Sequence, residues 1–180
     1  MHLLVKCLFI VFIPLSAFAT EAAGFYSNGR LIDGISINHR DGHFLKLFVG
    51  RKMFYATSEL LDDIQTLSSK MRVEFPNVEP MQIGDLSGPD GGKIPRHKSH
   101  HHGLDADIVY FRNDLAVQSP HTPEWDEYFV KNDQITENFD TEKNWRLFES
   151  IVEVTDVNRI FVDWAIKKHY CLEFQKRGLI

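Results

Sequence analysis

Apolar residues recur at helical spacing in three parts of the chain. A 3.6-residue period predicts a helix over 58–71, capped by Thr57 or Ser58, with an inward face of Leu60, Ile64, Leu67 and Met71. The same period predicts a second helix over 141–154, with an inward face of Trp145, Phe148, Ile151 and Val152. A shorter helix is expected over 164–172.

Short apolar runs bounded by turn residues predict the strands. Four of these runs stand out, at 44–49, 81–84, 108–111 and 159–163. Glycines and prolines exclude regular structure over 85–99, and the polar segment 113–140 predicts an excursion over the surface. Because strands and helices do not alternate regularly, the pattern predicts a mixed α+β domain and not a parallel sheet. No repeat or linker divides it, so we expect one domain over residues 20–180.

The first nineteen residues have the composition of a secretory signal peptide. Lys6 precedes an apolar run over 8–13, and Ala17-Phe18-Ala19 forms the small-x-small pattern that signal peptidase accepts. A membrane anchor is the alternative, but a proline and a serine interrupt the run, which is short for a hydrocarbon core of about 30 Å. We therefore expect a signal peptide over residues 1–19, export, and no membrane attachment after cleavage.

Composition is that of an ordinary globular protein. Of the 180 residues, 43% are hydrophobic and 25% are charged. The formal net charge is −5, from 20 basic and 25 acidic residues. Because phosphate binding needs a concentrated basic face, which this sequence lacks, we expect no nucleic-acid partner. One cysteine, Cys171, remains after signal cleavage, so we expect its thiol to be buried or to pair with a cysteine that this chain does not contain.

Histidines and aspartates cluster over 96–107, in the run Arg-His-Lys-Ser-His-His-His-Gly-Leu-Asp-Ala-Asp. A catalytic zinc site needs imidazole nitrogens and carboxylate oxygens on fixed elements, with one position left open for water. His100 and Asp107 supply one neutral and one anionic ligand, and Gly103 lies between them where the chain must turn before the predicted strand. This order of residues favours half of a zinc site.

Several members of the run also have simpler interpretations. His101 and His102 are expected to be solvated loop residues, and a histidine run can chelate metal loosely without a catalytic role. Asp105 is a typical turn residue after a glycine. Alternatively, Asp105 and Asp107 face the same side of an extended backbone, so that one binds metal while the other orients a ligand or a water molecule. The metal interpretation is favoured for His100 and Asp107 together.

The run and its flanks resemble the core of the penicillin-insensitive murein endopeptidases, a family of the LAS metallopeptidase superfamily. The superfamily motif, Ser-x-His followed by Gly and then Asp, is matched over 99–107. The other matching segments are Gly84-Asp85-Leu86-Ser87, Gly91-Gly92, Ser27-Asn28-Gly29, the helix over 61–71 and the block from Asn158 to Cys171. The resemblance therefore covers nearly all of the chain that follows the predicted signal peptide.

This resemblance implies roles for the residues of the run. His100 and Asp107 match the first two zinc ligands, and His97 matches a histidine close to the metal, which makes it our candidate catalytic residue. Ser99 and Asp105 are expected to support the ligands. The resemblance also implies Zn²⁺ as cofactor, crosslinked peptidoglycan as substrate, the periplasm as location, and hydrolysis of the D-alanyl–meso-diaminopimelyl amide. The implied fold is a small, mainly antiparallel sheet with flanking helices.

The sequence departs from the family pattern near its end. The family places its third zinc ligand in a His-x-x-His-x-His block on a closing strand, after the segment that matches Cys171, and that block is absent here. We therefore expect a truncated product or fragment that lacks the closing strand, binds zinc weakly and has little endopeptidase activity. His97 is the nearest substitute for the third ligand, followed by His121 and His169.

Two other functions stay open at this point. The chain could be an inactive homologue that binds peptidoglycan or metal without hydrolysis. It could also be a D-Ala-D-Ala carboxypeptidase, a class that shares the His-Gly-Asp motif but not the lead-in at 84–87 or the block at 158–171. The sequence does not indicate whether the protein is a monomer or an oligomer.

Overall fold

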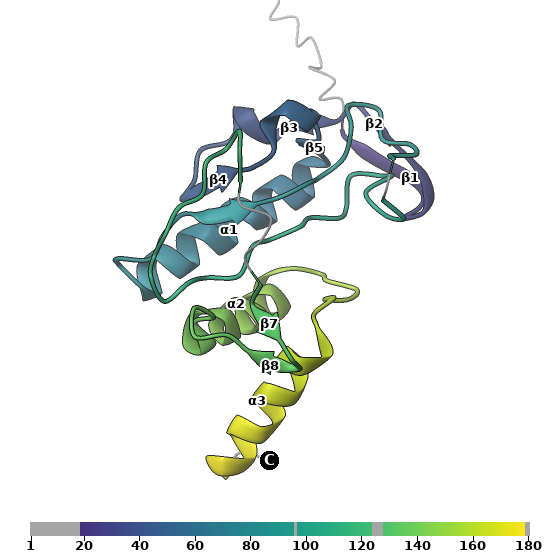
Figure 1. Ribbon diagram of the computed structural model, residues 1–180. Coiled ribbons are helices and arrows are strands. Elements are labelled where there is room, and N and C mark those ends of the chain that lie inside the picture. Colours follow the sequence, from purple (N-terminus) through teal and green to yellow (C-terminus); the bar gives the residue numbers. More distant parts are fainter. Residues whose placement is uncertain (1–18, 96, 124–127, 179–180) are drawn as a thin grey trace, which may run out of the picture.

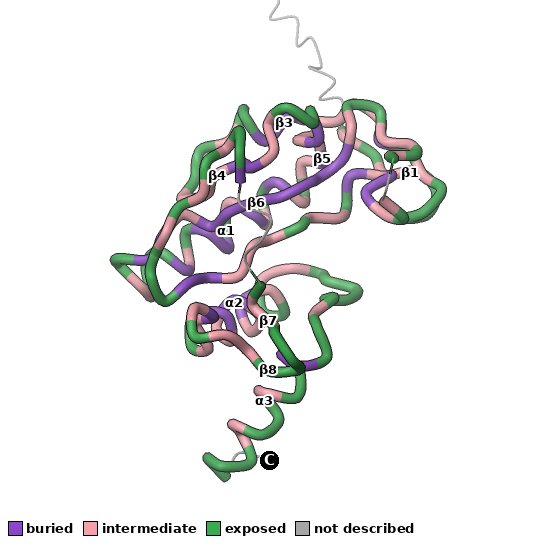
Figure 2. The backbone as a smooth tube through the Cα atoms, in the orientation of Figure 1, coloured by how far each residue is buried: buried purple, intermediate pink, exposed green. Residues whose placement is uncertain are grey.

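The computed structural model describes residues 19–95, 97–123 and 128–178. Helix α1 (Ser58–Glu74) lies with the short N-terminal strands, while α2 (Thr141–Val154) and α3 (Trp164–Lys176) form the other part of the molecule (Figure 1). Buried chain concentrates along α1 and strand β6 (Met81–Ile83) (Figure 2). The predicted signal peptide falls outside the described residues, apart from Ala19. Within the described ranges, no helix has the length and apolar character needed to cross a membrane.

Helix α1 confirms the first predicted helix and continues it to Glu74. Thr57 is the cap: its Oγ1 accepts the backbone N–H of Leu60 at 3.2 Å. The buried face consists of Leu61, Ile64, Leu67, Ser68 and Met71. The apolar side chains of this face pack with residues of β6 and with Leu147 of α2 in the larger of two apolar clusters. Helix α1 is therefore the central packing element of the N-terminal half.

The strands pair two by two. The antiparallel pairs are β1 (Glu21–Phe25) with β2 (Asn28–Ile32), β3 (Ile35–Ser36) with β5 (Tyr55–Ala56), and β7 (Val130–Lys131) with β8 (Gln134–Ile135). Strand β4 (Phe44–Lys46) pairs parallel with β6. The mixed α+β class, with small and mainly antiparallel sheets, is therefore confirmed.

Three of the predicted strands are corrected. The run over 44–49 stops as a strand at Lys46, because Phe48 takes a left-handed backbone conformation (φ 54°) that breaks the ladder. The run over 108–111 forms only an isolated bridge between Ile108 and Ile83. The run over 159–163 is not a strand: it forms no ladder with the described residues, and Phe161 is 82% exposed.

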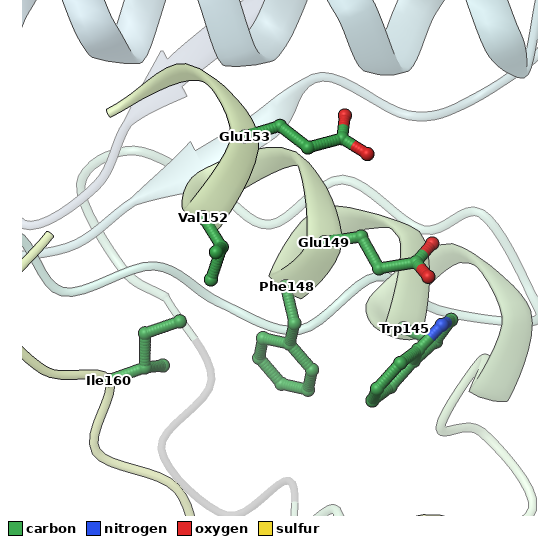
Figure 3. Close-up of a pocket in the computed structure, with 6 residues that line it drawn as sticks. All are labelled: Trp145, Phe148, Glu149, Val152, Glu153 and Ile160. Carbon is green, nitrogen blue, oxygen red and sulfur yellow. The ribbon is translucent and has the colours of Figure 1, made fainter. Parts of the chain in front are cut away.

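Helix α2 begins and ends where the sequence predicts. Asp140 caps it by accepting the backbone N–H of Lys143 at 2.8 Å. Its buried residues are Lys143, Asn144, Leu147 and Ser150. The prediction that Val152 faces inward is wrong, because this side chain is 65% exposed. It lines a shallow hollow of about 310 Å³ with Trp145, Phe148, Glu149, Glu153 and Ile160 (Figure 3).

Helix α3 is longer than predicted and carries the second apolar cluster. Asp163 caps it by accepting the backbone N–H of Ala165 at 2.7 Å. Its Ile166 and Tyr170 pack with Phe139, so the predicted surface excursion over 113–140 contributes a buried residue and the β7–β8 hairpin. Cys171 is exposed on this helix, which makes the expectation of a buried thiol wrong.

Candidate metal centre

Asp107 is placed by a short pairing between its segment and the residues that follow β6. The backbone N–H of Gly84 donates to the carbonyl of Asp107 at 2.7 Å, and the N–H of Asp107 donates to the carbonyl of Asp85 at 3.1 Å. A Cβ at position 84 would lie 2.9 Å from the Cβ of Asp107, closer than two carbons settle. Glycine therefore allows this approach, and it leaves the Asp107 carboxylate 56% exposed.

The side chain of His100 is turned inward by a loop that has left-handed backbone conformations at two positions. His100 has a φ of 65° and Gly103 a φ of 77°. Asp105 stabilises the first reversal, because its Oδ2 accepts the backbone N–H of His100 at 3.1 Å. The carbonyl of Gly103 accepts the N–H of Thr57 at the start of α1, at 3.0 Å. The loop is thus fixed to the core helix, and the imidazole of His100 is only 5% exposed.

His100 and Asp107 are spaced as metal ligands require. Nε2 of His100 lies 3.2 Å from Oδ1 of Asp107. Two atoms bonded to zinc at about 2.0–2.1 Å, at the tetrahedral angle, are roughly 3.4 Å apart. The pair therefore fits one edge of a zinc tetrahedron. His97 joins them in a group of three whose ligand atoms all lie within 4.8 Å of one another.

His97 lies between this pair and a buried cluster of charges. Its ring meets the ring of His100 edge to face, with centroids 5.2 Å apart, and its Nε2 is 3.3 Å from Oδ2 of Asp85. The Asp85 side chain has no exposed surface. Arg51 donates to the same Oδ2 at 2.5 Å, and Nζ of Lys46 lies 4.0 Å from Oδ1.

Burial and neighbouring charges act in opposite directions on the pKa of His100. Burial lowers it, but the hydrogen bond to Asp107 and the charges of Asp107, Asp105 and Asp85 outweigh that effect, so the pKa lies above its ordinary value. The surroundings thus favour positive charge at this ring, and a proton and a metal ion compete for it. For Lys46, burial is the largest effect and lowers the pKa to about 8, although Asp85 opposes it.

Most of this chain matches a known family. The family model described as penicillin-insensitive murein endopeptidase matches residues 22–178. The chain belongs to this family. The penicillin-insensitive murein endopeptidase of Escherichia coli O17:K52:H18 is 26% identical over 167 residues, which cover 86% of this chain and 57% of that protein. The one of Citrobacter koseri is 27% identical over 168 residues, with the same coverage. The chain thus spans little more than half the length of these curated relatives.

The residues predicted from the family resemblance gather at one place in the chain. His97, His100 and Asp107 form the group described above. Asp105 lies behind His100 and bonds its backbone. Ser99 is half-buried, and no hydrogen bond joins its side chain to any other described residue. The structure therefore brings four of the five predicted site residues together around His100.

The prediction that His101 and His102 are solvated is wrong. His101 is 5% exposed, and the side chain of His102 is 13% exposed. The left-handed turns fold the run back against the β1–β2 hairpin, where a Cβ at Gly29 would lie 2.8 Å from the Cβ of His102. Nδ1 of His102 lies 3.4 Å from Oδ2 of Asp105. These two histidines pack the loop that carries His100.

The other candidate third ligands lie elsewhere. Nε2 of His169, on α3, is 3.1 Å from Oγ1 of Thr141, and His121 is exposed within the excursion. Neither belongs to the group of possible metal ligands found in the described part of the chain. His97 is the one candidate of the three that the structure places beside His100 and Asp107.

Sequence reasoning missed the charged cluster behind His97. The sequence marks Asp85 only as part of the Gly-Asp-Leu-Ser motif, and it does not mark Arg51. Two sequence signals point to Lys46 and Asp85. Lys46 interrupts the apolar run Phe-Leu-Lys-Leu-Phe-Val, and Asp85 follows directly on Met-Gln-Ile-Gly, which is predicted as a strand. A charged residue in such a position needs a partner of opposite charge.

Proposed function

We propose that this chain is a zinc-dependent endopeptidase domain that hydrolyses the D-alanyl–meso-diaminopimelyl amide of crosslinked peptidoglycan in the periplasm. The observation that carries the proposal is the 3.2 Å separation between Nε2 of His100 and Oδ1 of Asp107, with His97 beside them. Membership in the murein endopeptidase family supports the substrate class. The signal-like residues 1–19 support the location.

Each residue of the site has a role in this proposal. His100 and Asp107 would hold a zinc ion, Asp105 supports the loop between them through its bond to the backbone of His100, and Ser99 precedes His100 in the same run. When bound, the zinc ion would supply Lewis acidity for the hydrolysis of the amide. His97 takes a proton from the attacking water and returns it to the leaving amine. No serine is acylated in such a reaction, so penicillin has no target in it.

A second candidate is a homologue that binds metal or peptidoglycan without hydrolysis. Catalytic zinc sites use three protein ligands. Among the described residues, His97 is the third member of the group of possible ligands, and its Nε2 is in contact with Asp85, so in this second candidate His100 and Asp107 are the two direct ligands. With two protein ligands we expect weak zinc binding and little hydrolysis. This observation concerns the number of ligands, so it is tested by measuring zinc affinity.

Digestion of purified crosslinked muropeptide dimers tests the first proposal. Release of monomers that EDTA abolishes and zinc restores is expected, and Asp107→Asn, which keeps the shape of the ligand but not its charge, should abolish it. Monomer release that persists in EDTA would contradict zinc dependence. Loss of a terminal D-alanine without separation of the dimer would instead indicate a carboxypeptidase.

Isothermal titration with zinc distinguishes the two candidates by their affinity for zinc. Binding of one equivalent with submicromolar affinity would exclude the weak-binding homologue. Weak binding together with intact dimers at saturating zinc would exclude the endopeptidase. The His100→Ala variant is the control, because binding that survives this change takes place at another site.

A further inference from the structure

Asp85 is a carboxylate that the fold buries completely and surrounds with positive or protonatable groups. Its side chain has no exposed surface, and Arg51, Lys46 and His97 approach it from three segments. Burying a carboxylate is unfavourable unless partners of opposite charge and hydrogen-bond donors compensate it. Arg51 provides the shortest of these contacts, 2.5 Å to Oδ2. These contacts hold the Asp85 carboxylate in one position, in which its Oδ2 contacts Nε2 of His97.

The backbone of Asp85 is fixed as firmly as its side chain. Its carbonyl accepts the N–H of Asp107 at 3.1 Å, and the next residue, Leu86, donates its N–H to the carbonyl of Met53 at 3.0 Å. One residue thus contacts both sides of the candidate metal centre: its main chain bonds the ligand Asp107, and its carboxylate contacts the ring of His97. A shift of Asp85 would change the two together.

We propose that Asp85 is a positioning residue that contacts Nε2 of His97, fixes the tautomer of that ring with its proton on Nε2, and leaves the lone pair on Nδ1. A neutral imidazole has one N–H and one lone pair, and a carboxylate next to one nitrogen stabilises the N–H on that side. With Nε2 at 3.3 Å from Oδ2 of Asp85, the lone pair belongs to Nδ1.

The consequence for chemistry rests on the proposed function, whereas the tautomer does not. If His97 takes a proton from water during amide hydrolysis, Nδ1 receives it and Nε2 keeps its contact with Asp85. The carboxylate then stabilises the imidazolium that forms, without itself becoming protonated. Arg51 and Lys46 keep Asp85 in place for this role, because Arg51 contacts Oδ2 at 2.5 Å and Nζ of Lys46 lies 4.0 Å from Oδ1.

Long-range ¹H–¹⁵N correlation spectra of the ¹⁵N-labelled full chain report the tautomer directly. The measurement is made at mildly alkaline pH, where imidazoles are neutral, and His97→Gln assigns the signal. We expect the Nε2–H tautomer in the wild type. A wild-type ring protonated at Nδ1 would overturn the proposal without any variant, so the test holds even if substitutions at position 85 prevent folding.

The Asp85→Asn variant tests the cause. Its amide can donate to Nε2, so we expect His97 to shift toward the Nδ1–H tautomer. Glu79→Gln is the matched control: it removes another buried carboxylate, paired with Lys143 at 3.1 Å, and should leave the His97 spectrum unchanged. An unchanged tautomer in Asp85→Asn, or an equal change in Glu79→Gln, would refute the assignment.

Kinetics separate this inference from the proposed function. If the wild type cleaves muropeptide dimers, Asp85→Asn should lower kcat by about 10²- to 10⁴-fold, the range for loss of proton-transfer catalysis, with little change in KM. Zinc affinity should change little, and an affinity loss as large as the loss in kcat would overturn the positioning role. A wild type without activity would refute the endopeptidase, while the spectra would still decide the role of Asp85.

Discussion

The contact between Gly84 and Asp107 sets the spacing of the two candidate ligands, and Gly84→Ala would disturb it. The added Cβ would lie 2.9 Å from the Cβ of Asp107. Because non-bonded carbons settle at about 3.5–4.0 Å, the two segments must separate by roughly 0.6 Å or more. Metal sites tolerate changes in ligand distance of only about 0.2 Å. We expect zinc affinity to fall by about ten- to hundredfold, as for other residues that orient ligands.

The assay is competition for zinc against a chelating dye, paired with urea unfolding of the metal-free chain. Gly84 does not have a positive φ, so alanine adds a steric clash and no left-handed backbone strain. Overpacking should lower stability by about 1–3 kcal/mol. Gly50→Ala is the control, because no atom lies within 4 Å of its added Cβ. Zinc affinity within twofold of the wild type would refute the claim that this contact sets the ligand spacing.

Two further predictions concern buried charges. The pKa of Lys46 is about 8 in the folded chain, against an ordinary 10.5. Between these pH values the unfolded chain binds more protons, so the free energy of unfolding should rise with pH by about 3 kcal/mol. Urea unfolding should show this rise in the wild type and not in Lys46→Met, and the same pH dependence in both chains would contradict it. Glu79→Gln leaves Asp140 as the remaining carboxylate partner of the buried Lys143 ammonium among the described residues, and should cost about 3 kcal/mol in the same assay. A loss below about 1 kcal/mol would mean that Asp140 alone compensates this charge.

The helices could be predicted because their determinants are local. Helix α2 has an aspartate cap at Asp140, an apolar period and no internal breaker, and it forms over the predicted range. The apolar run over 159–163 has a strand-like composition, but it meets no strand edge among the described residues and stays exposed. A strand needs a partner, which periodicity alone cannot supply. The prediction that His102 is solvated fails for the same reason, because the burial of this side chain depends on a hairpin that is distant in sequence.

The candidate site likewise contains residues that local sequence predicts and residues that it does not. His100 and Asp107 could be predicted as a pair because a glycine and a short turn lie between them. The role of Asp85 could not, because its partner Arg51 is 34 residues away in sequence and the contact requires the fold of the β4 region. What local sequence reveals is the chemistry of the metal-facing atoms. What holds those atoms in place comes from segments that the sequence does not mark as related.

The residues that hold the candidate ligands in place all lie in the N-terminal half. Substitutions at these residues and substitutions in the C-terminal helices should therefore have different effects. Gly103 fixes the histidine loop to Thr57 at the start of α1, and Gly84 and Asp85 fix Asp107 to the end of β6. Helix α2 instead joins this half through α1 and through the buried pair of Lys143 with Glu79, whereas α3 contacts β8. Changes in the aromatic cluster of α3 should therefore lower stability while leaving the ligand spacing intact, whereas changes at the end of β6 act on the ligands directly.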